Sequence, residues 1–220
     1  LCFTYFFGFA QEEKILQQPD IPGDIMLDLG FNSLINNSES INTKLFPSRS
    51  FGIYYLLNRK LSDQFIFNSA IGLTFEKIGF ADRANYQVDD LKIISWDTLG
   101  VGELKSNILA INYLELPLEF RFYPSRTVDG EGLFVSIGGI LGLKIAAKTK
   151  IKYKLDGSNF KETNTGNFGL SDFRYGMVAR VGFKKVNAFV KYYMSDIWRE
   201  APVVQVTPSQ FTFGINLTGF

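Results

Sequence analysis

Apolar and polar residues alternate with a period of two about eight times along this chain of 220 residues. Such alternation is typical of a β-strand with one apolar face, because successive side chains of a strand point to opposite sides. In the last run, one parity holds Phe211, Phe213, Ile215 and Leu217, and the other holds Thr212, Gly214 and Asn216. No apolar stretch reaches the length of a transmembrane helix. The sequence therefore predicts an all-β protein.

The connections between the runs alternate between long and short. The long ones are 36–48, 81–107, 156–169 and 199–209, and the short ones are 62–64, 125–132 and 184–185. In an up-and-down meander, such connections gather at opposite rims. Outer-membrane barrels have this arrangement, with long extracellular loops and short periplasmic turns. We therefore predict an eight-stranded antiparallel up-and-down transmembrane β-barrel.

The polar parity is predicted to face the lumen and the apolar parity the lipid. The polar parity is rich in glycine, which a water-facing surface does not need but a narrow barrel interior does. It also carries charges of both signs, which would neutralise one another inside a barrel. This predicted lumen charge network consists of Asp28, Glu76, Glu115, Glu119, Arg121, Lys144, Arg174, Arg180 and Lys191; Lys148 is placed on the same face of its run. A soluble lipocalin-like barrel, with the apolar face inside, is the alternative.

Aromatic residues near the ends of the runs are interpreted as the interfacial girdles of a membrane barrel. The residues concerned are Phe75, Phe80, Phe122, Tyr123, Phe173, Tyr175, Tyr192 and Tyr193.

The N-terminal segment reads as an export signal. Residues 1–10, LCFTYFFGFA, form an apolar run that ends in small residues, and we interpret them as a signal-peptide remnant. A buried N-terminal strand is the alternative. Residues 11–24 are then a periplasmic segment and 25–220 the barrel, which places the protein in the bacterial outer membrane. The single cysteine, Cys2, would be removed with the signal.

Composition argues against most enzyme classes and against a nucleic-acid partner. The chain has no histidine, so it lacks the usual base for nucleophile activation and the usual catalytic zinc ligand. Its 23 basic and 22 acidic residues show no basic excess for nucleic acid. The aspartates of 81–107 are interpreted as solvated charges rather than a calcium site. We predict a non-enzymatic protein without cofactor or metal.

One strand resembles a known family. The stretch Asn112-Tyr113-Leu114-Glu115-Leu116-Pro117-Leu118 is similar to a Tyr-Leu-Glu-Leu/Ile-Pro-Leu strand of the PorT-like outer-membrane β-barrels. Pro22-Gly23-Asp24 before the first run and the strand 174–183 add to this likeness, which covers about residues 19–220. The resemblance implies an outer-membrane barrel of about eight strands, with relatives linked to type IX secretion and gliding machinery.

These observations predict a scaffold or accessory subunit of an outer-membrane secretion or assembly complex. Its partners would be outer-membrane lipid and other proteins of that complex. Apolar residues in the long connection 81–107 are the candidate partner contact: Leu91, Ile93, Ile94 and Trp96. A small pore or transport barrel, a membrane-embedded enzyme and the lipocalin-like carrier are the alternatives.

Overall fold

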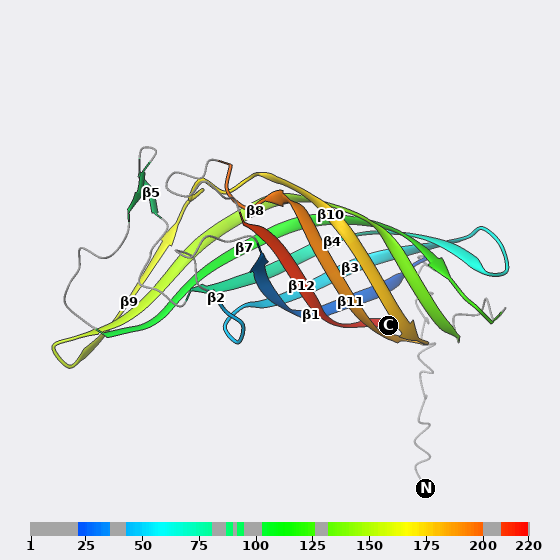
Figure 1. The fold of residues 1–220 in the computed structure, drawn as a ribbon, viewed down its shortest axis with the longest axis horizontal. Coiled ribbons are helices and arrows are strands. Elements are labelled where there is room, and N and C mark those ends of the chain that lie inside the picture. The colour runs from blue at the N-terminus through cyan, green and yellow to red at the C-terminus, as the bar shows by residue number, and fades with distance from the viewer. Residues whose placement is uncertain are drawn as a thin grey trace, which may run out of the picture.

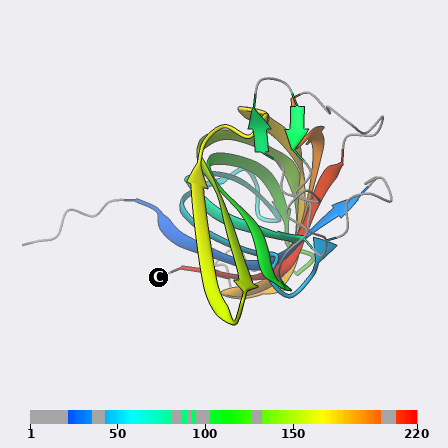
Figure 2. The same ribbon diagram turned by 90° about the vertical axis from the view of Figure 1, so that its left-hand side faces the viewer.

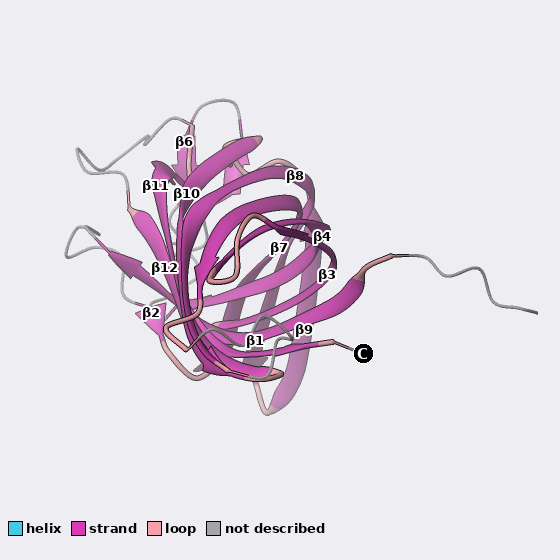
Figure 3. Ribbon diagram, turned by 90° about the vertical axis from the view of Figure 1, so that its right-hand side faces the viewer, coloured by secondary structure: helices cyan, strands magenta, loops and turns pink. Residues whose placement is uncertain are grey.

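Eight antiparallel strands close into a ring (Figures 1 and 3). The computed structural model describes residues 22–35, 43–80, 87–89, 92–94, 103–125, 132–199 and 208–219. The ring consists of β1 (Asp24–Ile35), β3 (Arg49–Lys60), β4 (Phe65–Phe80), β7 (Glu103–Phe122), β8 (Leu133–Leu155), β10 (Phe173–Phe183), β11 (Val186–Asp196) and β12 (Ser209–Thr218). Each strand pairs with the next, and β12 closes the ring on β1. The predicted fold is confirmed.

Helices play no part in the described fold, and no helix there is long and apolar enough to cross a membrane. Both chain ends of the ring lie at one rim, because Met26 pairs with Thr218. The short turns at 61–64 and 184–185 belong to the same rim, which is the periplasmic side of such barrels. The opposite rim is therefore extracellular.

Two long strands continue past the extracellular rim and gain a third partner there (Figure 2). The outer part of β8 pairs with β9 (Ser158–Thr165) on one side and with β7 on the other. We call this three-stranded part the outer sheet: residues 103–110, 148–155 and 158–165. The short strand β2 (Thr43–Lys44) pairs with β4, and β5 (Gln87–Asp89) forms a separate hairpin with β6 (Lys92–Ile94).

The segment 156–169, predicted as one long connection between ring strands, contains the strand β9. The turn between β8 and β9 is Asp156-Gly157, and both residues have positive φ, 47° and 83°. Asp-Gly with two positive φ values is a favoured two-residue hairpin turn. This signal was present in the sequence, but the polar composition of the segment obscured it.

Along the ring strands, the outward parity is mostly apolar, whereas the inward parity holds the polar and charged side chains together with some apolar ones. On β8, Ile137 is 56% exposed, whereas its neighbour Ser136 is 1% exposed. The same parity holds along the other ring strands. In water, this broad apolar belt would stay exposed to solvent, which would cost a large free energy. The lipocalin-like alternative, with an apolar interior, is contradicted.

A bulge in β8 changes which residues face the lumen. Asn112 pairs with Ala146 but Tyr113 pairs with Lys144, so Ile145 is the extra residue. Beyond it the inward residues are Ala147, Thr149 and Ile151. The interpretation of Lys148 as lumen-facing was therefore wrong, because the bulge reverses the parity that a regular strand would keep. Lys148 is exposed on the outside.

The girdle interpretation holds for only part of the aromatic set. Phe80, Tyr123 and Tyr193 are 6%, 1% and 1% exposed and lie inside the barrel. The others point outward, and cross-strand pairs such as Phe65 with Phe122 place their ring centroids 5.0 Å apart. Position near a strand end was thus a weaker guide than parity along the strand.

Candidate functional site in the lumen and at the outer rim

Eight charged side chains are buried inside the described barrel, and their charges cancel. The four carboxylates and four cations are Asp28, Glu76, Glu115 and Glu119 with Arg121, Arg174, Arg180 and Lys191. Burial of a charge is costly unless it is paired and hydrogen-bonded. Inward glycines make room for these long side chains. At Gly142, an added Cβ would lie 2.9 Å from Cγ of Arg174.

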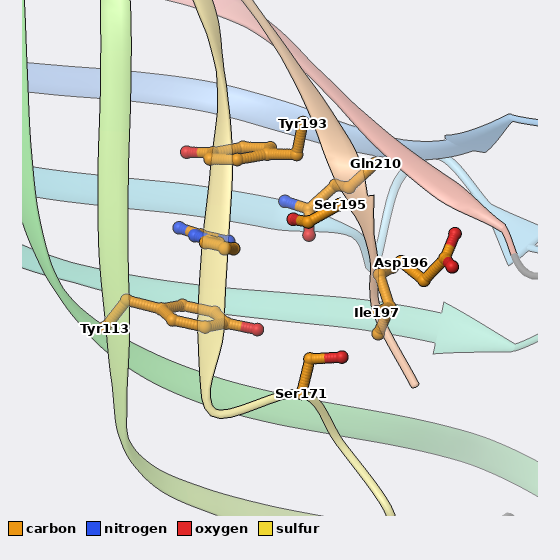
Figure 4. Close-up of a pocket in the computed structure, with 8 residues that line it drawn as sticks. Tyr113, Ser171, Tyr193, Ser195, Asp196, Ile197 and Gln210 are labelled. Atoms are coloured by element: carbon orange, nitrogen blue, oxygen red, sulfur yellow. The ribbon is translucent and has the colours of Figure 1, made fainter. Parts of the chain in front are cut away.

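Arg174 joins two carboxylates from other strands. It donates to both oxygens of Glu76 at 2.9 Å, and it also donates to Glu115. Its guanidinium carbon lies 3.4 Å from the ring centroid of Tyr113 and 4.0 Å from that of Tyr193. Figure 4 shows the rings of Tyr113 and Tyr193. Such a bidentate, stacked arginine is held in a single geometry.

Arg180 and Lys191 form the second half of the network, nearer the periplasmic rim. Arg180 donates from Nη1 to Asp28 at 2.9 Å and from Nε to Glu119 at 2.9 Å. Lys191 lies 2.9 Å from Oδ2 of Asp28. Ser136 donates a further hydrogen bond to Glu119 at 2.8 Å.

Glu115 links the two halves of the network. It accepts from the hydroxyl groups of Tyr54 and Tyr193, each at 2.6 Å, and Lys191 lies 3.5 Å away. Lys191 in turn donates to Tyr54 at 2.7 Å. The sequence reasoning missed these tyrosines, although both occupy the polar parity of their strands.

Two members of the predicted network have other partners. Arg121 is buried at the periplasmic end, where it lies 4.0 Å from the ring centroid of Phe134. In the described part of the chain it forms no ion pair with a carboxylate. Lys144 lies at the extracellular rim, where its Nζ is 2.9 Å from Asp172 and donates to the Leu170 carbonyl at 2.8 Å.

An apolar cluster lies at the extracellular end of the lumen, beyond the charges. We call this cluster the outer cap; it consists of Leu34, Ile78, Phe80, Leu109, Ile111, Tyr113, Ala147, Phe168, Leu170, Ile197 and Trp198. Two loops supply its last four members. They are joined by backbone hydrogen bonds from Ser171 to Ile197, 2.8 Å, and from Arg199 to Gly169, 2.9 Å. The cap was not predicted from the sequence.

A small pocket adjoins the cap on the extracellular side of Arg174 (Figure 4). It is lined by Tyr113, Ser171, Arg174, Tyr193, Ser195, Asp196, Ile197 and Gln210. Gln210 donates to Glu76 at 2.8 Å, so part of the lining belongs to the ion network. The pocket is thus the outer end of the network.

The strand that resembles the PorT-like barrels supplies the centre of this arrangement. Leu114, Leu116 and Leu118 face outward, while Glu115 and Pro117 face the lumen. Pairing of β4 with β7 is interrupted between Gly72/Glu115 and Ser69/Leu118. The gap includes Pro117, which lacks the N–H that a central strand would use. The proline thus occupies a position where the ladder is open.

Comparison with protein families assigns the chain. Residues 9–195 match the family model described as the outer membrane protein beta-barrel domain. The chain belongs to this family. The prediction of a bacterial outer-membrane location is confirmed.

Solved structures and curated proteins add less. Ail, the attachment invasion locus protein of Yersinia pestis, is similar at 13% identity and a TM-score of 0.39, over 90% of this chain and 99% of Ail. Ail in complex with the heparin analogue sucrose octasulfate gives 13% identity and a TM-score of 0.35 over the same shares. No curated protein matches the sequence.

The predicted partner-contact residues of this family member are only partly described. Ile93 and Ile94 belong to the backbone of β6, which pairs with β5 through Gln87 and Ile94. Leu91 and Trp96 lie outside the described residues. The same holds for the predicted signal-peptide remnant, 1–10. Partner contact by these residues stays a prediction.

The lumen has the chemistry of a structural network. The carboxylates Glu76, Glu115 and Glu119 each accept from arginine and from at least one neutral donor. A catalytic carboxylate would need a free oxygen that faces a substrate. Both oxygens of each of these three carboxylates already accept a hydrogen bond from the barrel's own side chains.

Proposed function

We propose that this outer-membrane barrel is a non-enzymatic scaffold or accessory subunit of a secretion or assembly complex. The resemblance of the stretch 112–118 to the PorT-like barrels supports this role. The observation that carries the proposal is the buried ion network in the lumen, with an apolar cluster at its extracellular end. A transport barrel needs an open interior, whereas eight strands leave a space just wide enough for side chains. In this protein that space holds a neutralised ion network. Function is therefore assigned to the outside of the barrel.

The outer sheet supports a role in protein assembly. β9 is the last strand of the sheet, so one of its edges has no partner among the described strands. A free strand edge presents unpaired N–H and C=O groups, and extended segments of other proteins pair with such edges. The outer sheet thus offers a docking edge beyond the membrane.

Site-specific photo-cross-linking in native membranes tests this role. A cross-linking amino acid at Asn164, on β9, is expected to capture a protein partner. The same group at Ser62, in the exposed periplasmic turn, is the control for non-specific capture. Equal capture at both positions, or none at Asn164, would contradict the proposal.

Conductance in planar bilayers is a second measurement, directed at the pore alternative. The purified barrel is expected to give no steady open-pore current. A stable current like that of an open porin would reject the closed scaffold, whatever the cross-linking shows.

A further inference from the structure

Five lysines gather on the outward face of the outer sheet and of the adjoining part of β4. They come from three strands: Lys77 on β4, Lys148, Lys150 and Lys152 on β8, and Lys161 on β9. Cross-strand partners share a face of a sheet. Lys152 pairs directly with Lys161, while Lys77 and Lys148 both pair with Ala110, one from each side. We call this set the lysine face.

Among the described strands, the acidic residue nearest by register on the side of the lysine face is Glu103, which pairs with Lys154, two residues beyond Lys152. The other members of the lysine face on β9, Thr163 and Thr165, are opposite Lys150 and Lys148 and are exposed. The acidic residue of β9, Glu162, pairs with the inward Ile151 and accepts from Tyr153 at 2.7 Å on the other face. None of the five lysines forms a salt bridge within the described part of the chain. The charges of Lys161 and Lys152, and also those of Lys77 and Lys148, lower the pKa of Lys150.

The height of this face fits the headgroup layer of the outer leaflet. The outward apolar residues of β8 run from Leu133 to Ile145. That length rises about 40 Å along the strand and about 28 Å along the membrane normal, close to the ~25 Å apolar band of such barrels. Lys148 lies three residues farther on, roughly 7 Å above the belt. On β4, Lys77 is the next outward residue after Phe75.

We propose that the lysine face binds the phosphate groups of a phosphorylated glycolipid in the outer leaflet, with the acyl chains against the apolar belt below. Charge complementarity supports this occupant. The five lysines form no salt bridge with a described residue, and they lie with the hydroxyl groups of Thr163 and Thr165 at the depth of the lipid phosphates. The face looks sideways, because it continues the lipid-facing side of β4, β7 and β8. A soluble polyanion has no acyl chains that could contact the adjoining apolar belt.

Lipid binding by matched variants tests the proposal. Full-length barrel is placed in nanodiscs of neutral lipid and titrated with a bis-phosphorylated lipid A-type glycolipid, or with the same glycolipid after dephosphorylation. The face variant is K150Q/K152Q/K161Q. The control is K60Q/K184Q/K185Q, which removes the same charge from exposed sites at the opposite, periplasmic rim. Resistance of the folded barrel to unheated detergent electrophoresis verifies that each variant is folded.

Wild type and control are expected to bind the phosphorylated glycolipid equally, and the face variant on the order of 100-fold more weakly. Affinity for the dephosphorylated glycolipid should be low in all three proteins. Equal binding by the face variant and the control would overturn the proposal. It would also be overturned if dephosphorylation had no effect, or if soluble heparin bound to the lysine face with higher affinity than the glycolipid.

Discussion

The lumen and the outer sheet treat charge in opposite ways. Inside the barrel, four carboxylates face four cations, and Glu115 alone accepts from two tyrosines and an arginine. On the outer sheet and the adjoining part of β4, five lysines share one face, and none of them forms a salt bridge with a described residue. Burial forces the first pattern, because an unpaired charge out of water is costly. Repulsion between exposed like charges destabilises a fold modestly, so the lysine face indicates binding rather than a contribution to stability.

The largest expected effect comes from breaking the lumen side of this comparison. Arg174→Met leaves Glu76 and Glu115 buried without their shared cation, and loss of one partner of a buried pair costs about 3 to 5 kcal/mol. The urea unfolding midpoint in detergent should fall strongly. Arg199→Met is the matched control, since Arg199 pairs with Asp172 at an exposed site and should change the midpoint little. Equal midpoints for the two variants would refute the idea that the lumen network stabilises the barrel.

Neighbouring glycines on β8 sharpen the same contrast between inside and outside. A Cβ on Gly138 would lie 2.0 Å from the Leu118 carbonyl oxygen and 2.6 Å from the Cα of Glu119. On Gly139, which faces outward, the nearest atom would be 4.0 Å away. We expect Gly138→Ala to cost about 1 to 3 kcal/mol or more through overpacking.

Gly139→Ala should instead be neutral or stabilise by up to about 1 kcal/mol, because it restricts the unfolded chain. Denaturant midpoints of the two variants, measured in the same detergent, provide the comparison. If both alanines had the same effect, tight packing of the inward glycines would not be what limits these positions.

The ring of strands followed from the sequence because one physical rule governs it. Lipid on one side and side-chain packing on the other impose strict alternation, and this is readable from Leu114, Glu115 and Leu116 alone. The rule failed where strands leave the membrane. There the extra residue Ile145 reverses the parity of β8, and a bulge leaves no clear signal in a single sequence.

Parity along the strands predicts which charged residues share the interior, but it does not predict their partners. Parity assigns Arg174 and Arg121 to the same interior, yet only the register and height of their strands decide which carboxylates they reach. Arg174 meets Glu76 on β4, a separation of 98 residues in sequence. Arg121 instead stacks on Phe134. The outer cap escaped prediction for a similar reason, since Leu170 and Trp198 come from loops joined only in three dimensions.

The smallest expected effect concerns the ion pair between the two regions, Lys144 with Asp172. The hydrogen bond and charge of Lys144, together with Arg199, hold the pKa of Asp172 below its ordinary value. A carboxyl with a lowered pKa in the folded state adds stability above its unfolded pKa, and this stability is lost as pH falls. Lys144→Met should therefore raise the pKa of Asp172, measured by NMR titration of its carboxyl carbon.

The same variant separates exposed from buried pairing through salt. Asp172 is solvent-exposed, so added salt should reduce the difference in the pKa of Asp172 between wild type and Lys144→Met. Exposed charges are screened within about 8 to 10 Å at moderate ionic strength. The lowered unfolding midpoint of Arg174→Met should persist in added salt, because the ion pairs of Arg174 are buried and buried pairs are screened much less. If the pKa shift of Asp172 did not depend on salt, the pair of Lys144 and Asp172 would behave like the buried pairs of the lumen. The contrast between the lumen and the rim would then not hold.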